Sequence, residues 1–319
     1  MGTTDTGHRP VMTDRVLALL APALEPPGAI LLDATLGRAG HASALLSEHP
    51  GLTLIGVDTD DAAIEASRVL LAPYRERVTL VHAVYDEIPA ILARLGQQSV
   101  HGILFDLGVS SPQLDDPDRG FAYSYDAPLD MRMDRTGPLT AADVVNTYSA
   151  ARLARVLREY GEERFARRIA DALVRERSRA PLTSTLRLGE IVRDSIPAPA
   201  RRHGGNPAKR TFQALRIEVN GELDALRRAL PAALDVVAVG GRIVILAYHS
   251  LEDRLVKRAF AERAADTTPR GLPVLLPGSR PQFRILTRGA ERPAADEVAG
   301  NPRAASARLR AAERIRAAA

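Results

Sequence analysis

The chain has 319 residues, 45% of them hydrophobic, which is enough to bury the core of one large domain with an insertion or of two domains. It contains no cysteine, which excludes disulfides, thiolate zinc sites and cysteine nucleophiles and fits a reducing cytoplasm. The net charge of +4 allows contact with nucleic-acid phosphates, but from charge alone solvated arginine-rich faces explain it better. A polar N-terminal stretch and the absence of a membrane-length apolar run predict a cytoplasmic protein without a membrane partner.

Apolar runs alternate with helical patterns over the first third of the chain. An amphipathic helical pattern ends at Pro26-Pro27-Gly28 and precedes the first strand. Strands are expected at 29–34, 53–57, 78–84 and 102–105, with helices from 40, at 61–71 and at 87–95. Near-continuous apolar strands separated by helices are typical of a parallel sheet covered on both faces, so this region predicts an α/β fold.

The alternation stops after residue 111. Turn signals such as Asp115-Asp116-Pro117-Asp118 come first, and helical patterns follow at 150–160, 162–177 and 186–196. Beyond Gly204-Gly205, a long helical pattern leads to one more buried strand at 241–247. We therefore expect a Rossmann-like parallel sheet formed by residues 1–111 and 207–319, which would bind the cofactor. An α-helical domain of residues 112–206 is inserted into it, and we expect this domain to help recognise RNA.

The stretch Asp33-Ala34-Thr35-Leu36-Gly37-Arg38-Ala39-Gly40-His41 joins the first strand to its helix. A strand, a tight turn and a helix N-terminus open nucleotide-binding folds, although two glycines also make an ordinary turn. Asp58 ends the second strand, where such folds place an acid that accepts hydrogen bonds from ribose hydroxyls; its alternative role is a helix cap. The acid before the glycines suits a ligand with an ammonium group better than a pyrophosphate, which favours S-adenosylmethionine over NAD.

Asp106 follows the fourth strand and opens the stretch Leu107-Gly108-Val109-Ser110-Ser111-Pro112-Gln113-Leu114-Asp115. The carboxyl ends of parallel strands line the ligand crevice, and the glycine and small residues leave room for a planar substrate. A carboxylate there can accept an N–H of a nucleobase amine and localise the nitrogen lone pair for in-line attack on a methyl group. We predict that Asp106 is catalytic, with a structural turn or cap as the alternative.

Three further patterns have weaker chemical meaning. His249-Ser250 with Asp253 lacks the G-x-S-x-G elbow of a hydrolase, so we expect Ser250 to cap a helix beginning at Leu251. The aspartates at 115, 116, 130 and 134 match no known carboxylate cage, so no metal site is predicted. The inserted region is rich in arginine, which either follows RNA phosphates or forms solvated helix faces. These arginines are Arg164, Arg167, Arg168, Arg175, Arg177 and Arg179.

Nine blocks spread over almost the whole chain form a recognisable set. The blocks are His8-x-Pro10-Val11-Met12, Asp33–His41, Asp106–Asp115, Arg119-Gly120-Phe121, Pro128–Asp134, Tyr160–Ala166, Pro207–Asn220, His249–Arg254 and Asn301–Ala304. Together they resemble the RsmH (MraW) family. The resemblance implies a class I methyltransferase that uses S-adenosylmethionine. Its implied substrate is the N4 amine of a decoding-centre cytosine in small-subunit (16S) ribosomal RNA, within an assembled or nearly assembled 30S subunit; a homodimer stays open.

The resemblance also implies a set of cofactor contacts. They fall on Ala39, Gly40, His41, Asp58, Tyr85, Asp106 and Gln113. Two residues depart from the family pattern: Ala39 stands where glycine is usual, and Asn206 stands where histidine is usual. The alternatives are a methyltransferase for another amino-bearing base, a non-catalytic nucleic-acid-binding or assembly protein and, more distantly, an NAD oxidoreductase.

Overall fold

The computed structural model describes residues 10–201, 206–266 and 279–317. His8 of the first family block and the pair Gly204-Gly205 therefore lie outside the described residues. The chain forms two compact units: unit 1 consists of Met1–Gly108 and Asp224–Ala319, and unit 2 consists of Val109–Leu223. In the described residues no helix combines the length and the apolar character that a membrane crossing requires.

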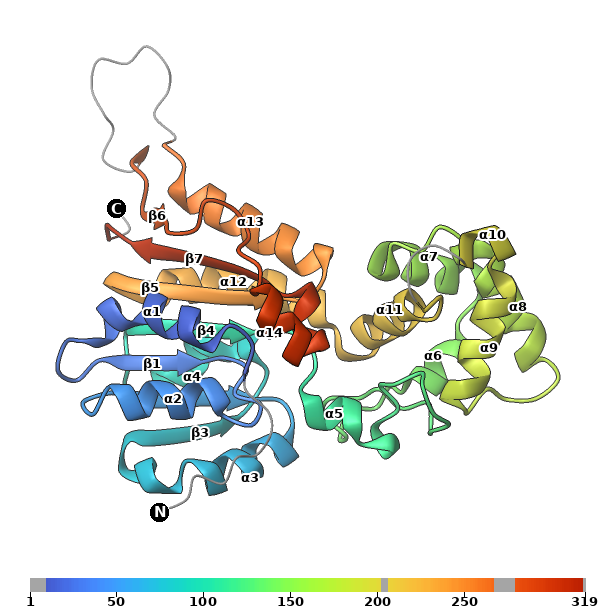
Figure 1. Cartoon of the computed structure of the whole chain (residues 1–319), viewed down its shortest axis with the longest axis horizontal. Coiled ribbons are helices and arrows are strands. Elements are labelled where there is room, and N and C mark those ends of the chain that lie inside the picture. The colour runs from blue at the N-terminus through green and yellow to red at the C-terminus, as the bar shows by residue number, and fades with distance from the viewer. Residues whose placement is uncertain (1–9, 202–205, 267–278, 318–319) are drawn as a thin grey trace, which may run out of the picture. The chain divides into compact units, whose positions relative to one another are not determined.

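Unit 1 is built on a seven-stranded sheet with the strand order β3-β2-β1-β4-β5-β7-β6 (Figure 1). The strands are β1 Ile30–Asp33, β2 Thr53–Asp58, β3 Val78–His82, β4 Val100–Asp106, β5 Val237–Ala247, β6 Phe283–Ile285 and β7 Arg308–Arg314. Strands β1 to β5 pair in parallel, which confirms the predicted α/β fold. Strand β7 runs antiparallel to both β5 and β6 and was not predicted.

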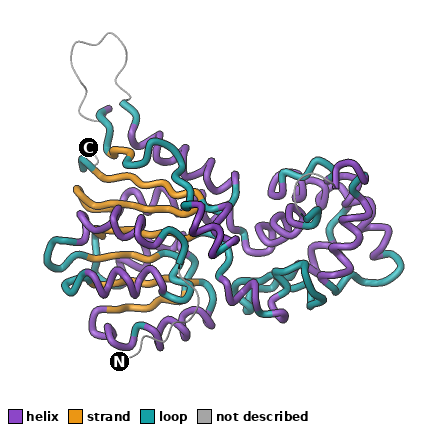
Figure 2. Tube along the Cα trace, in the orientation of Figure 1, coloured by secondary structure: helices purple, strands orange, loops and turns teal. Residues whose placement is uncertain are grey.

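Helices cover both faces of this sheet, as the Cα tube in Figure 2 shows. The helices that accompany the sheet are α1 Thr13–Leu24, α2 Gly40–Glu48, α3 Asp61–Leu70, α4 Ile88–Arg94, α12 Glu222–Val236, α13 Ser250–Ala264 and α14 Ala295–Gly300, with short helices η1 Ala72–Arg77, η2 Tyr85–Glu87 and η5 Pro302–Ser306. Helices α1, α2 and α3 contribute to one hydrophobic cluster, while α4, α12 and α13 contribute to another. Successive strand residues alternate between the clusters, because strand side chains point to opposite faces: Ile103 belongs to the second and Leu104 to the first.

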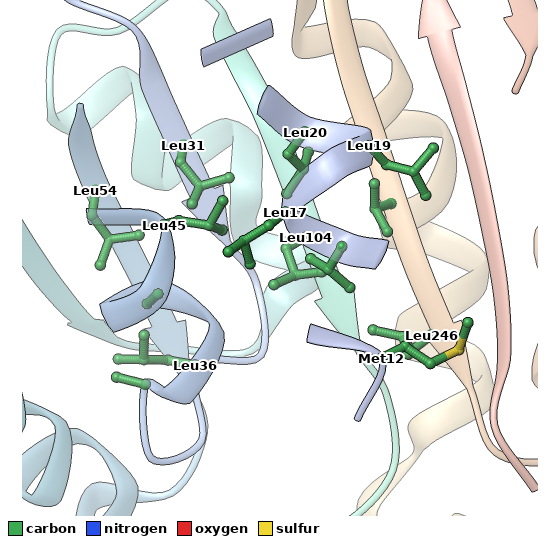
Figure 3. Close-up of a cluster of buried hydrophobic side chains, with 14 of the residues drawn as sticks. Met12, Leu17, Leu19, Leu20, Leu31, Leu36, Leu45, Leu54, Leu104 and Leu246 are labelled. Carbon is green, nitrogen blue, oxygen red and sulfur yellow. The ribbon is translucent and has the colours of Figure 1, made fainter. Parts of the chain in front are cut away.

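Figure 3 shows the first cluster at the centre of the sheet. Leu31, Leu54 and Leu104 come from three neighbouring strands and are fully buried. Leu20 of α1 and Leu45 of α2 pack against this face. This packing fixes the ends of β1, β2 and β4, and with them the acidic residues that follow the buried runs.

Unit 2 is helical and has its own hydrophobic core. Its elements are α5 Ser111–Asp115, η3 Pro117–Arg119, α6 Ala141–Thr147, α7 Ala150–Gly161, α8 Ala166–Arg177, α9 Thr185–Ser195, α10 Ala198–Arg201 and α11 Lys209–Asn220. The sequence places the end of the inserted domain at residue 206, whereas unit 2 of the structure extends to Leu223. Unit 2 is longer because α11 buries Phe212 and Leu215 in its core. Asn206, one of the two departures from the family pattern, accepts a hydrogen bond from the Ala208 N–H at 2.9 Å just before α11.

Candidate functional site

The loop between β1 and α2 starts at a buried carboxylate. Asp33 ends β1, is only 2% exposed and accepts a hydrogen bond from the Thr35 N–H at 3.2 Å. Burial raises the pKa of Asp33 to about 7, and the nearby carboxylates of Asp106 and Asp58 add to the rise, while His41 and the Thr35 N–H oppose it. The predicted acid before the glycines is therefore a group that changes charge near neutral pH.

The titration of Asp33 predicts how stability changes with pH. Since the pKa rises from an ordinary 3.8 to about 7 on folding, the folded state holds the proton more tightly, and the stability that this proton provides is lost as the pH rises from about 4 through 7. We expect the free energy of unfolding of the wild type, relative to that of Asp33→Asn, to fall by at most about 1.4 kcal/mol per pH unit in this window. Chemical denaturation of both proteins from pH 4.5 to 8 measures the difference; parallel profiles would contradict it.

Asp58 ties the same loop to the neighbouring strand. It ends β2, and its two carboxylate oxygens accept hydrogen bonds from the N–H groups of Gly37 at 2.7 Å and of Asp60 at 2.9 Å. Burial raises the pKa of Asp58. The helix-cap role considered for Asp58 belongs to Asp60, whose side chain accepts from the Ala62 N–H at the start of α3. Asp58 therefore has no capping role and faces the glycine loop.

The two residues before His41 have strict backbone requirements. Ala39 is buried and adopts a φ of 57°, in the left-handed region where an L-residue costs about 1–2 kcal/mol. This conformation explains why glycine is the usual residue at that position. Gly40 begins α2, and a Cβ there would overlap the ring of Pro10. The family block at the N-terminus and the glycine loop are therefore packed directly against each other.

Asp106 is held at the end of β4 by groups from two other segments. Its N–H donates to Thr35 Oγ1 at 2.6 Å, and the Tyr248 hydroxyl donates to its Oδ1 at 2.7 Å. Its Oδ2 lies 3.6 Å from Nε2 of His41, and the side chain remains 27% exposed. Burial, followed by the charge of Asp106, raises the pKa of Tyr248 well above its ordinary value, so Tyr248 acts as a neutral donor. The carboxylate is oriented but remains open to solvent.

His41 and Tyr85 complete the predicted residues of unit 1. His41 is 5% exposed, and neither ring nitrogen has a hydrogen-bond partner among the described residues. Tyr85 begins η2 after β3, and its ring stands edge-on to Phe105 of β4, with centroids 5.7 Å apart and planes at 79°. The structure therefore gathers Asp33, His41, Asp58, Tyr85 and Asp106 at the carboxyl ends of the parallel strands, where ligands of such folds bind.

Gln113 belongs to unit 2, where it lies on the short helix α5. Its side chain is 5% exposed, and its Oε1 accepts a hydrogen bond from the Ser110 N–H at 3.0 Å. This bond closes the turn that leads into α5. The assignment of Gln113 as a cofactor contact stays a prediction.

The stretch after β5 corrects one prediction and adds a residue. Helix α13 begins at Ser250, so Ser250 is not its cap; His249 is the cap, with its Nδ1 accepting from the Glu252 N–H at 3.4 Å. Glu252 in turn accepts from the N–H groups of Tyr248 at 2.8 Å and of His249 at 3.2 Å. Asp253 binds Arg310 at 2.7 Å, so this aspartate supports β7 and not a hydrolytic triad. The reciprocal cap fixes the backbone of Tyr248, a site residue that sequence reasoning missed.

Comparison with known proteins is consistent across almost the whole chain. The sequence profile of the MraW methylase family matches residues 5–315. Ribosomal RNA small subunit methyltransferase H of Thermobifida fusca is 64% identical over 315 residues, which cover 99% of this chain and 96% of that protein. The protein of the same name from Saccharopolyspora erythraea is 63% identical over 315 residues, which cover 99% of this chain and 96% of that protein. The protein of the same name from Frankia alni is 64% identical over 308 residues, which cover 96% of this chain and 95% of that protein.

Proposed function

This chain belongs to the MraW methylase family, and on that premise we propose that it methylates the N4 amine of a decoding-centre cytosine in small-subunit ribosomal RNA. It is a methyltransferase that uses S-adenosylmethionine, as the acid before the glycine loop predicted. The observation that carries the proposal is the carboxylate of Asp106, oriented by Tyr248 at the carboxyl end of β4. The names of the relatives support small-subunit ribosomal RNA as the substrate. The family resemblance supports the N4 amine of a cytosine as the methylated group.

The residues at the strand ends fit this cofactor. The two ring nitrogens of His41 are buried without a partner in the described part of the chain, so they are available to a bound polar ligand. The carboxylates of Asp33 and Asp58 lie at the glycine loop, where they suit an ammonium group and ribose hydroxyls respectively. Tyr85 offers an aromatic face, and Ala39 and Gly40 form the turn. When bound, S-adenosylmethionine supplies a methyl group on a positively charged sulfur.

Asp106 supplies the acceptor that an exocyclic amine requires. The lone pair of such an amine is delocalised into the base, so the nitrogen is a weak nucleophile until an N–H is bound by an acceptor. The Tyr248 hydroxyl occupies Oδ1 of Asp106, which leaves Oδ2, on the side of His41, to accept the amine N–H. Orientation and hydrogen-bond acceptance of this kind need no strong base. Because the amine is paired in a duplex, the target base must be single-stranded or flipped.

The decisive experiment is mass mapping of ribosomal RNA nucleosides from cells with and without this protein. We expect one cytosine of the small-subunit RNA to lose its N4-methyl group when the protein is absent. Turnover on isolated small subunits, on naked ribosomal RNA and on DNA then separates the proposed substrate from other amino-bearing bases. An unchanged nucleoside map would overturn the proposal, and cofactor binding without turnover on any of these substrates would favour a non-catalytic assembly protein.

Three finer expectations belong to the same proposal. We propose that the substrate is a 30S subunit that is assembled or nearly so, and that the enzyme acts in the cytoplasm. A higher turnover on isolated subunits than on naked RNA supports the first. A homodimer stays a prediction that sedimentation of the full chain tests.

A further inference from the structure

One surface of unit 2 carries an excess of arginine around a shallow hollow. Its lining residues are Arg164, Phe165, Arg167, Arg168, Asp171 and Arg175, which we call the arginine face. They recur at the spacing of one side of a helix, since α8 spans Ala166–Arg177 and residues three, four and seven apart lie together. The opposite side of α8 buries Ile169 and Leu173 in the core of unit 2. The helix is thus anchored on one side and presents its arginines on the other.

Most of this charge is not neutralised. The single carboxylate of the face, Asp171, lies 3.9 Å from Arg167, the outer limit of an ion pair, and Arg167 is 84% exposed. Arg164, Arg168 and Arg175 form no ion pair within the described ranges. Arg164 lies over the ring of Phe165, with its guanidinium carbon 5.9 Å from the ring centroid. The face therefore holds four guanidinium groups against one carboxylate.

Three other exposed arginines, on or next to α8 and α9, are paired. Arg179 and Arg187 both bind Glu176, at 3.0 and 2.7 Å, and Arg187 also binds Glu190 at 3.0 Å. Arg193 binds Asp194 at 3.2 Å. Around α8 and α9, the exposed arginines without an ion pair therefore gather on the arginine face, while those outside it are paired. The contrast points to an anionic partner for the arginine face.

The chemistry of the face identifies that partner as a phosphodiester backbone. Like charges at helical spacing repel one another, so the unpaired arginines are an unfavourable arrangement until anions bind between them. Guanidinium groups bind phosphates in bidentate geometry, and several in a row suit a chain of phosphates better than one small anion. Phe165, which packs against the core of unit 2 with Arg164 over its ring, adds apolar surface beside these guanidinium groups. The face offers no buried polar group that would read a base sequence.

We propose that the arginine face binds the backbone of the RNA substrate through phosphate contacts that are independent of sequence. The identity of the RNA rests on the proposed function, whereas binding to RNA phosphates rests on the face itself. The face contributes affinity and placement, and it takes no part in methyl transfer. Its removal therefore raises KM for the RNA and leaves kcat unchanged at saturating substrate.

The test uses the full chain and two triple variants with the same change in charge. Arg164→Gln, Arg168→Gln and Arg175→Gln together remove the unpaired arginines. Arg179→Gln, Arg187→Gln and Arg193→Gln together form the control, because these arginines are paired with carboxylates. Binding to small-subunit ribosomal RNA, alone and in isolated small subunits, is measured from 50 to 300 mM salt. Thermal unfolding shows whether both variants fold as the wild type does.

In the arginine-face variant, we expect the slope of log K against log salt to become shallower by about 2 to 3, one for each phosphate that the variant no longer binds. The dissociation constant at low salt should rise about tenfold or more, while the control changes much less. An equal change in both variants, or no change in either, would overturn the proposal, as would a wild type that binds no RNA. If the wild type binds RNA with the expected slope difference but methylates none, the proposed function fails and the arginine face stands.

Discussion

Replacing Asp106 with asparagine is expected to lower kcat for methyl transfer by about 10²- to 10⁴-fold, the usual contribution of a positioned proton acceptor. Asparagine has the same shape, and its oxygen can still accept the Tyr248 hydroxyl now found 2.7 Å from Oδ1. Its NH₂ group then takes the place of Oδ2, and an NH₂ group donates a hydrogen bond where the substrate amine needs an acceptor. Turnover is measured at saturating RNA and cofactor, with the affinity for S-adenosylmethionine measured separately by calorimetry.

Two tyrosine variants show whether the effect comes from orientation of this carboxylate. Tyr248→Phe removes the donor and should lower kcat by about 10- to 100-fold, in line with the loss of a hydrogen bond to a charged group. Tyr74→Phe is the matched control, because Tyr74 lies in η1 before β3 and packs against Arg77. If Asp106→Asn binds the cofactor and keeps wild-type turnover, Asp106 is not the acceptor.

Gly120→Ala is expected to destabilise unit 2 by about 2–5 kcal/mol, the sum of a left-handed backbone strain and an overpacked contact. Gly120 follows η3 with a φ of +69°, and an added Cβ would overlap the carbonyl oxygen of Pro128 and lie 2.9 Å from the Asp130 nitrogen. Both obstacles are backbone atoms. They are held in place because the Met131 N–H donates to the Arg119 carbonyl at 3.0 Å, so neither can move aside cheaply.

Gly221→Ala is the control that separates strain from overlap. Gly221 also has a left-handed backbone, with a φ of +61°, but an added Cβ would meet no atom within 4 Å. Its expected cost is therefore only about 1–2 kcal/mol. Hydrogen exchange of the amides of α7 and α8 measures the stability of unit 2 in each variant. Equal losses of stability in the two variants would show that the close approach to Pro128 does not contribute to the destabilisation.

The parallel part of the sheet was predictable because each strand carries its own signal. Strands β1, β2 and β4 are buried runs that end in an acid, and the runs and the acids are both visible in the sequence. Strand β7 was missed because Arg308–Arg314 is rich in arginine and alanine and looks like the compositionally biased tail around it. The role of its arginines is visible only in the folded protein, where Arg310 forms an ion pair with Asp253 of α13. No pattern in the neighbouring sequence predicts such an ion pair.

The residues of the candidate site also divide into those that local sequence patterns reveal and those that only the fold reveals. The loop Asp33–His41, Asp58 and Asp106 were found because acids and glycines at strand ends have a known chemical meaning. Tyr248 was missed because its role depends on the ends of β4 and β5 lying side by side, which brings its hydroxyl to Asp106 across 142 positions of sequence. The exchange of capping roles between His249 and Ser250 depends on one residue of helix register, which sequence patterns rarely resolve.

The separation of Asp106 from Tyr248 also sets an order of events during synthesis. All of unit 2 emerges from the ribosome after Asp106 and before Tyr248, since the unit spans Val109–Leu223. Domains fold largely as units while the chain is still growing, so unit 2 can form its core while β4 still lacks β5 as a neighbour. The carboxylate gains its oriented form only when β5 docks. A chain that stops before residue 237 would contain the glycine loop and all of unit 2 but neither β5 nor Tyr248, so we expect it to lose at least as much activity as Tyr248→Phe.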